Sequence, residues 1–115
     1  MYRISYAEIV NDSSDERRAQ ERLALDHAID LLTAAEEKGP NSAEATQAVL
    51  YLQKLWGFLI KDLADPSNEL GEALRANLIS IGLWVIKEAD QIMSEKSKNF
   101  AGIIDVTRTI RDGLR

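Results

Sequence analysis

The stretch from Leu78 to Ile86 constrains the fold of this chain most strongly, because seven of its nine residues are large and apolar. Its length fits a buried strand, but the apolar pattern continues on both sides at steps of three and four residues, the repeat of one helical face. A helix that is apolar this far round either packs among several neighbours or keeps one face for a partner. Its main stripe consists of Leu74, Leu78, Ile81, Val85, Ala89 and Ile92, and a second stripe on the flank consists of Ile79, Leu83 and Ile86.

The composition favours one helical domain covering residues 1–115. Aromatic residues make up only 6% of the chain and no cysteine is present, which excludes disulfides and thiolate metal sites. No apolar run reaches the roughly 18–20 residues that cross a bilayer, so we expect no membrane insertion. The first ten residues lack the apolar core and cleavage site of a signal peptide, and we therefore expect a cytoplasmic protein.

The charge balance argues against a nucleic-acid-binding protein. The net charge is −5, with 14 basic and 19 acidic residues, and no basic stripe is visible. Contacts between basic side chains and phosphates supply most of the affinity for nucleic acids, so we expect no direct DNA binding.

Periodicity and capping residues predict four helices, at about 14–38, 42–64, 72–95 and 100–113, after an N-terminal extension of residues 1–12. Ser13 and Glu16 fit a capping box at the first helix, and Gly39-Pro40 fits its end. Asn41 or Ser42 caps the second helix, which ends at Asp65-Pro66, because the residue before a proline is pushed out of the helical region. Short connections between amphipathic helices predict an all-α fold, a small antiparallel bundle.

The sequence offers little for catalysis, and we expect a protein without enzymatic activity, metal or cofactor. His27 is the only histidine, and without cysteine it cannot complete an ordinary zinc site. A role as a general base beside Asp30 is a weaker interpretation than a surface histidine. No phosphate-binding glycine loop and no Gly-x-Ser-x-Gly motif is present.

Two sets of apolar residues, one on the second and one on the third predicted helix, lie outside the main core-facing stripe of their helix. They either pack inside the bundle or form a groove for an amphipathic helix of a partner. Gly57 and Gly82 each lie inside a helix at a cost of about 1 kcal/mol relative to alanine, which predicts a close approach of two helices at both. The candidate partner-binding residues are Tyr51, Leu55, Phe58, Ile79, Leu83 and Ile86.

Several long segments resemble the FlaF family of flagellar biosynthesis regulators, and the resemblance spans nearly the whole chain. The segments are Tyr6-Ala-Glu-Ile-Val10, Leu55-Trp-Gly-Phe-Leu-Ile-Lys-Asp-Leu-Ala-Asp-Pro66, Leu74-Arg-Ala-Asn-Leu-Ile-Ser-Ile-Gly-Leu-Trp-Val85, Phe100-Ala-Gly-Ile-Ile104 and Ile110-Arg-Asp-Gly-Leu114.

The resemblance implies a non-enzymatic role in flagellum assembly. FlaF-type proteins are similar to chaperones that hold flagellin, whose ends are amphipathic helices, before export. We therefore expect flagellin as the partner, masked by the apolar groove. Two alternatives stay open: an adaptor that binds the post-transcriptional regulator FlbT and controls translation of flagellin mRNA, and a structural homodimer formed through the same apolar surface.

Overall fold

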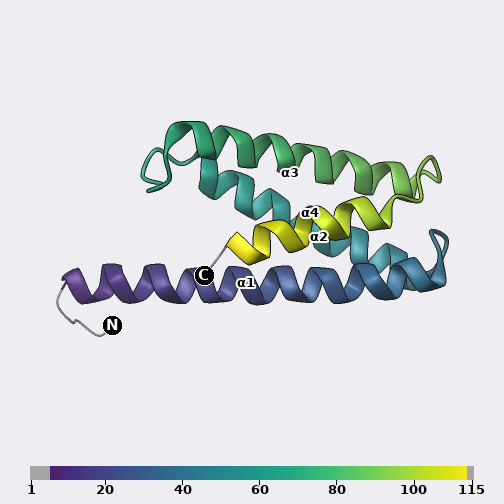
Figure 1. The fold of residues 1–115 in the computed structure, drawn as a ribbon, viewed down its shortest axis with the longest axis horizontal. Coiled ribbons are helices and arrows are strands. Elements are labelled where there is room, and N and C mark those ends of the chain that lie inside the picture. The colour runs from purple at the N-terminus through teal and green to yellow at the C-terminus, as the bar shows by residue number, and fades with distance from the viewer. Residues whose placement is uncertain (1–5, 114–115) are drawn as a thin grey trace.

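The computed structural model describes residues 6–113, with side chains from residue 16 onward. It contains the helices α1 (Tyr6–Lys38), α2 (Ala43–Ala64), α3 (Glu72–Met93) and α4 (Phe100–Gly113). Successive helices run in opposite directions (Figure 1), which confirms the all-α bundle predicted from the sequence. The predicted bounds of α2, α3 and α4 agree with the structure to within two residues.

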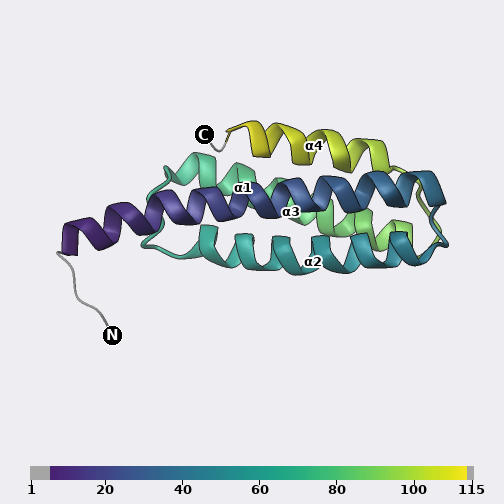
Figure 2. The same ribbon diagram turned by 90° about the horizontal axis from the view of Figure 1, so that it is seen from below.

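The packing follows the order of the helices along the chain. Helix α2 packs against both α1 and α3, and α1 packs against α4 on its other side. Two perpendicular views place α1 and α3 at opposite corners of the bundle, with α2 and α4 between them on opposite sides (Figures 1 and 2). The core contains Ala28, Ile29, Leu32, Ala35, Ala45, Ala48, Val49, Leu52, Trp56, Val85, Ala89, Ile92, Phe100, Ile103 and Ile104.

Local chemistry fixes where the helices begin and end. Gly39 has a φ of 95°, the left-handed conformation that terminates helices at glycine. Ser42 is the N-cap of α2, because its side chain accepts a hydrogen bond from the backbone N–H of Ala45 at 3.0 Å. Asp65 ends α2 in an extended conformation, as the following Pro66 requires. These three boundary predictions are therefore confirmed.

The predicted start of the first helix was wrong. Helix α1 begins at Tyr6, so Ser13 lies inside the helix and cannot be its N-cap. Neither proline nor glycine occurs between Tyr6 and Lys38. The polar residues around Ser13 lower helix propensity by only about 0.5 kcal/mol each, which does not break a helix.

Gly57 and Gly82, the glycines singled out in the sequence, have different environments. A Cβ atom on Gly82 would lie 2.4 Å from Cε3 and 2.8 Å from Cζ3 of Trp56, so glycine allows α3 to approach the buried indole of α2. Gly57, by contrast, is exposed, and a Cβ atom there would have no neighbour within 4 Å. The predicted close approach is confirmed at Gly82 and wrong at Gly57.

Candidate protein-binding surface

The helices differ in length, and this difference leaves one part of the bundle uncovered. Helix α4 has 14 residues, whereas α2 and α3 have 22 each. At about 1.5 Å per residue, α4 is therefore about 12 Å shorter than either neighbour. Arg111 donates a hydrogen bond from Nη1 to Oδ1 of Asp26 at 3.0 Å, which places the last turns of α4 beside Asp26. Beyond this level, toward the start of α1, the described chain supplies α1, α2 and α3 only (Figure 1).

The main apolar stripe of α3 runs from the covered half of the bundle into the uncovered half. Its C-terminal members, Val85, Ala89 and Ile92, are fully buried. Farther toward the N-terminus of α3, Ile81 and Leu78 are only partly buried, and Leu74 is 48% exposed. The exposure rises along one face of α3 toward the end of the bundle that α4 does not reach (Figure 1). Leu70, in the preceding loop, adds a further exposed leucine.

Helix α1 contributes charged residues at the same level. Glu21 lies one turn before the buried Leu25 and is half-buried, and Arg18 and Arg22 are exposed. The pKa of Glu21 is raised above its ordinary value, mainly because burial removes water from the carboxylate and secondly because the Asp62 carboxylate lies nearby. We call the surface beyond α4 the uncovered face; it comprises Arg18, Glu21, Arg22, Leu70, Leu74, Leu78 and Ile81.

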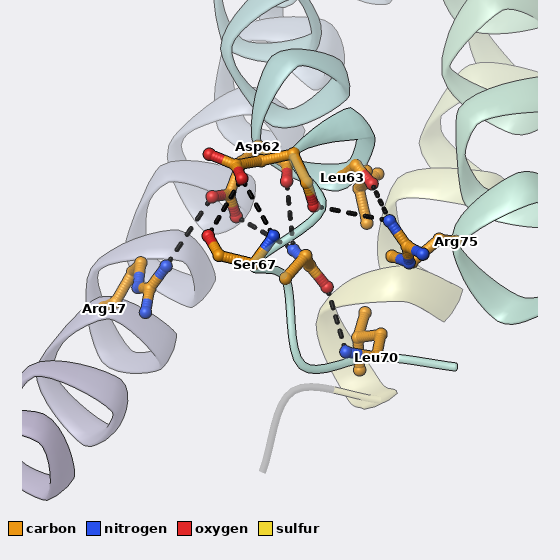
Figure 3. Close-up of polar contacts among 8 residues, drawn as sticks. Arg17, Asp62, Leu63, Ser67, Leu70 and Arg75 are labelled. Atoms are coloured by element: carbon orange, nitrogen blue, oxygen red, sulfur yellow. Dashed lines mark hydrogen bonds and ion pairs between the residues drawn. The ribbon is translucent and has the colours of Figure 1, made fainter. Parts of the chain in front are cut away.

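The connection between α2 and α3 closes this end of the bundle (Figure 3). Asp65 Oδ1 accepts hydrogen bonds from the backbone N–H and the hydroxyl of Ser67, both at 2.9 Å. The hydrogen bond from the Ser67 backbone N–H is the main reason why the pKa of Asp65 is lowered, and the hydrogen bond from the Ser67 hydroxyl is the second. Asn68 donates from Nδ2 to the carbonyl of Asp62 at 3.1 Å, so the loop folds back onto α2.

Two arginines tie neighbouring helices to the end of α2. Arg75 donates from Nη1 to the carbonyls of Leu63 at 3.2 Å and Asp65 at 3.3 Å, and so joins α3 to the last turn of α2 (Figure 3). Arg17 lies 3.6 Å from an oxygen of Asp62 and joins α1 to the same turn. These contacts fix the helices that border the uncovered face.

Three of the residues predicted to bind a partner lie on the side of α2 that faces α1. Tyr51 donates a hydrogen bond from its hydroxyl to the carbonyl of Ala24 at 3.3 Å, and its ring meets His27 edge-on with ring centroids 4.9 Å apart. Leu55 is partly buried on the same face of α2. Phe58 follows on this face and is 74% exposed.

The other three predicted residues lie on α3, which packs against the opposite flank of α2. A Cβ atom on Gly82 of α3 would meet Trp56 and Ile60, which lie about half a turn round α2 from Tyr51. Ile79 and Ile86 are partly buried, and Leu83 is 56% exposed. The structure therefore separates the six residues into two groups and does not bring them together as one groove. Binding by either group stays a prediction.

The described residues show no arrangement suited to metal-dependent chemistry or membrane insertion. Across residues 16–113 no group of three His, Asp or Glu side chains could hold a metal ion. His27 is exposed, with its ring against Tyr51. None of the helices in the described chain combines the length and apolar character that crossing a bilayer requires.

A family model described as flagellar protein FlaF matches residues 2–114 of the chain. The chain belongs to the FlaF family. The resemblance seen in the sequence is therefore confirmed, and FlaF is a family of flagellar proteins and not of enzymes. No curated protein and no solved structure matches the chain.

The uncovered face was missed by the sequence-based choice of site in this FlaF-family chain. Leu74, Leu78 and Ile81 were assigned to the core stripe, and Arg18 and Glu21 received no role. The predicted helix bounds already contained a signal, because the last helix was much shorter than its neighbours and could not cover the whole stripe.

Proposed function

We propose that this chain is a flagellin-binding export chaperone whose uncovered face receives an amphipathic helix of flagellin. Membership of a flagellar protein family supports the flagellar role. The observation that supports the mode of binding is the exposed continuation of the α3 core stripe at Leu74 and Leu78 beyond the end of α4. A helix placed there takes the position that α4 leaves empty along α1 and α3.

The chemistry of the uncovered face suits an amphipathic helix. Its apolar residues lie on α3, and charged residues of α1 lie across from them, so an apolar face with a polar edge is complementary. Masking such a helix in the cytoplasm keeps unpolymerised flagellin from associating with itself, because the apolar surface that drives association is removed from water.

A titration of the chain with purified flagellin, followed by calorimetry at two temperatures and two salt concentrations, tests this proposal. We expect binding with a negative heat-capacity change, since apolar area is buried. A parallel titration with FlbT identifies the adaptor role: binding to FlbT without binding to flagellin would refute the chaperone proposal.

Two leucines on opposite sides of α3 locate the site. Leu74 and Leu83 are nine residues apart, about half a turn round the helix, and are 48% and 56% exposed. Burying the exposed part of one leucine contributes roughly 1–1.5 kcal/mol. We therefore expect Leu74→Ala to raise the Kd for flagellin about five- to tenfold. Leu83→Ala is the matched control, and its Kd stays at the wild-type value.

The outcome also tests the surface chosen from the sequence. If Leu83→Ala weakens binding and Leu74→Ala does not, flagellin binds the side of α3 that carries Leu83, and the uncovered face is the wrong site. Phe58→Ala tests the flank of α2 that faces α1 in the same way. Circular dichroism of each variant shows that the fold is intact, as expected for side chains that are about half exposed or more.

A further inference from the structure

The N-terminal part of α1 continues beyond the rest of the bundle. Arg17 pairs with Asp62, only two residues before the end of α2 at Ala64. Residues 6–16 of α1 therefore extend past the other helices, as both views show (Figures 1 and 2). We call residues 6–16 the α1 arm. At about 1.5 Å per residue it is about 16 Å long.

We infer that the α1 arm of a second copy of this chain occupies the uncovered face, so that two copies form a symmetric dimer with exchanged arms. The arm is long enough for this role, because α4 falls about 12 Å short of its neighbours. A chain cannot place the arm on its own uncovered face, because the arm and residues 17–38 form one continuous helix. The occupant must therefore come from another molecule.

The direction of the arm fits the bundle. In a dimer with a two-fold axis across α1, the two α1 helices run antiparallel, and each arm lies along residues 17–26 of its partner. Helix α4 also runs antiparallel to α1 (Figure 1). The exchanged arm thus continues the alternation of helix directions in the half of the bundle that α4 does not cover.

The charges of the two segments are complementary. The α1 arm contains four acidic residues, Glu8, Asp12, Asp15 and Glu16, and no basic residue. The next six residues, 17–22, contain three arginines and one glutamate, and Arg18 is exposed on the uncovered face. Antiparallel overlap places each acidic arm beside the arginines of the other copy. The arm also contributes Tyr6, Ile9 and Val10, which suit the exposed leucines of α3.

This dimer does not depend on the proposed function, and it is tested without flagellin. Sedimentation equilibrium of the full chain at about 1–100 µM, a range that brackets micromolar association, measures the dissociation constant of the dimer. Two double variants reverse the charges on either side: Arg18→Glu with Arg22→Glu on the uncovered face, and Asp12→Lys with Asp15→Lys on the arm. Each variant alone places like charges together, and we expect its dissociation constant to rise at least about tenfold.

Mixing the two variants provides the decisive measurement. An acidic uncovered face then meets a basic arm, and a basic face meets an acidic arm, so the mixture forms a heterodimer with near wild-type affinity. The matched control is Lys54→Glu with Lys61→Glu, which reverses the same number of charges at exposed positions of α2 and leaves the dimer unchanged. Raising the salt concentration weakens the wild-type dimer, because salt screens exposed charges.

Three results would each overturn the inference. The first is a wild-type chain that stays monomeric at the highest concentration of that range. The second is a dimer that neither double variant weakens more than the Lys54→Glu, Lys61→Glu control does. The third is a mixture of the two variants that fails to restore association. Circular dichroism and thermal unfolding of every variant establish that the bundle itself is intact.

Discussion

Placing the same alanine at two glycines of this bundle should have opposite effects on stability. Gly57 and Gly82 both lie inside helices, so replacing either removes the same conformational penalty and favours the helix by about 1 kcal/mol. The surroundings differ. The new methyl group at Gly57 meets no neighbour within 4 Å, whereas at Gly82 it meets two ring carbons of Trp56 at 2.4 and 2.8 Å.

The magnitude follows from how little Trp56 can move. Its indole is 1% exposed and rigid, so relief of the overlap requires α2 and α3 to shift apart. Overpacking of this kind costs typically about 1–3 kcal/mol. Gly57→Ala should therefore stabilise the fold by up to about 1 kcal/mol, and Gly82→Ala should destabilise it by up to about 2 kcal/mol after the helix gain is subtracted.

Urea unfolding followed by circular dichroism gives the free energy of unfolding and the m-value of each variant. The difference between the two variants isolates the steric effect at Trp56, because the gain in helix propensity cancels. Equal stabilisation by both substitutions would refute the close packing of α3 on Trp56. A changed m-value for Gly82→Ala would indicate that the native or unfolded state had changed in compactness.

Two further substitutions test a helix cap and a half-buried carboxylate. Ser42→Ala removes the side-chain acceptor for the Ala45 N–H and should destabilise the protein by about 1 kcal/mol in thermal unfolding; Ser80→Ala, at an exposed position inside α3, should not. Glu21→Gln should stabilise the protein at neutral pH. Because the folded pKa of Glu21 is raised, the folded state holds its proton more tightly, and stability falls as the pH rises from the ordinary glutamate pKa through the folded value. Unfolding measured from acidic to neutral pH should show this advantage of Glu21→Gln disappear at low pH, and an advantage that persists there would contradict it.

Most helix ends could be predicted from the sequence because they depend on local chemistry. Gly39-Pro40 and Asp65-Pro66 stop helices through the backbone conformation of the residues themselves, whatever surrounds them. The start of α1 could not be predicted in this way. Ser13 and Glu16 have the side chains of a capping box, but the same residues are tolerated inside a helix when no proline or glycine precedes them.

The candidate site could not be predicted from helical periodicity, because periodicity does not show how the helices pack against one another. Helical spacing shows which residues of α2 share a face, but it does not show which neighbour that face meets. Tyr51 turned out to contact α1, and Gly82 placed α3 on the other flank of α2, so the predicted groove was divided. Periodicity also gave Leu74 and Val85 the same role, although Val85 is fully buried and Leu74 is 48% exposed.

Because the flagellin helix and the exchanged arm require the same surface, the two proposals together predict competition. Only monomers can bind flagellin, so the apparent Kd rises in proportion to the inverse of the monomer fraction, about tenfold when roughly 90% of the chain is dimeric. Titrations of flagellin at chain concentrations well below and well above the dimer dissociation constant should differ accordingly. The Asp12→Lys, Asp15→Lys variant, whose dimer dissociation constant is raised at least about tenfold, should show a correspondingly smaller change of affinity between the two concentrations. If the wild-type affinity for flagellin is independent of chain concentration while the dimer is present, flagellin and the α1 arm bind different surfaces, and Leu74→Ala then shows which of them lies on the uncovered face.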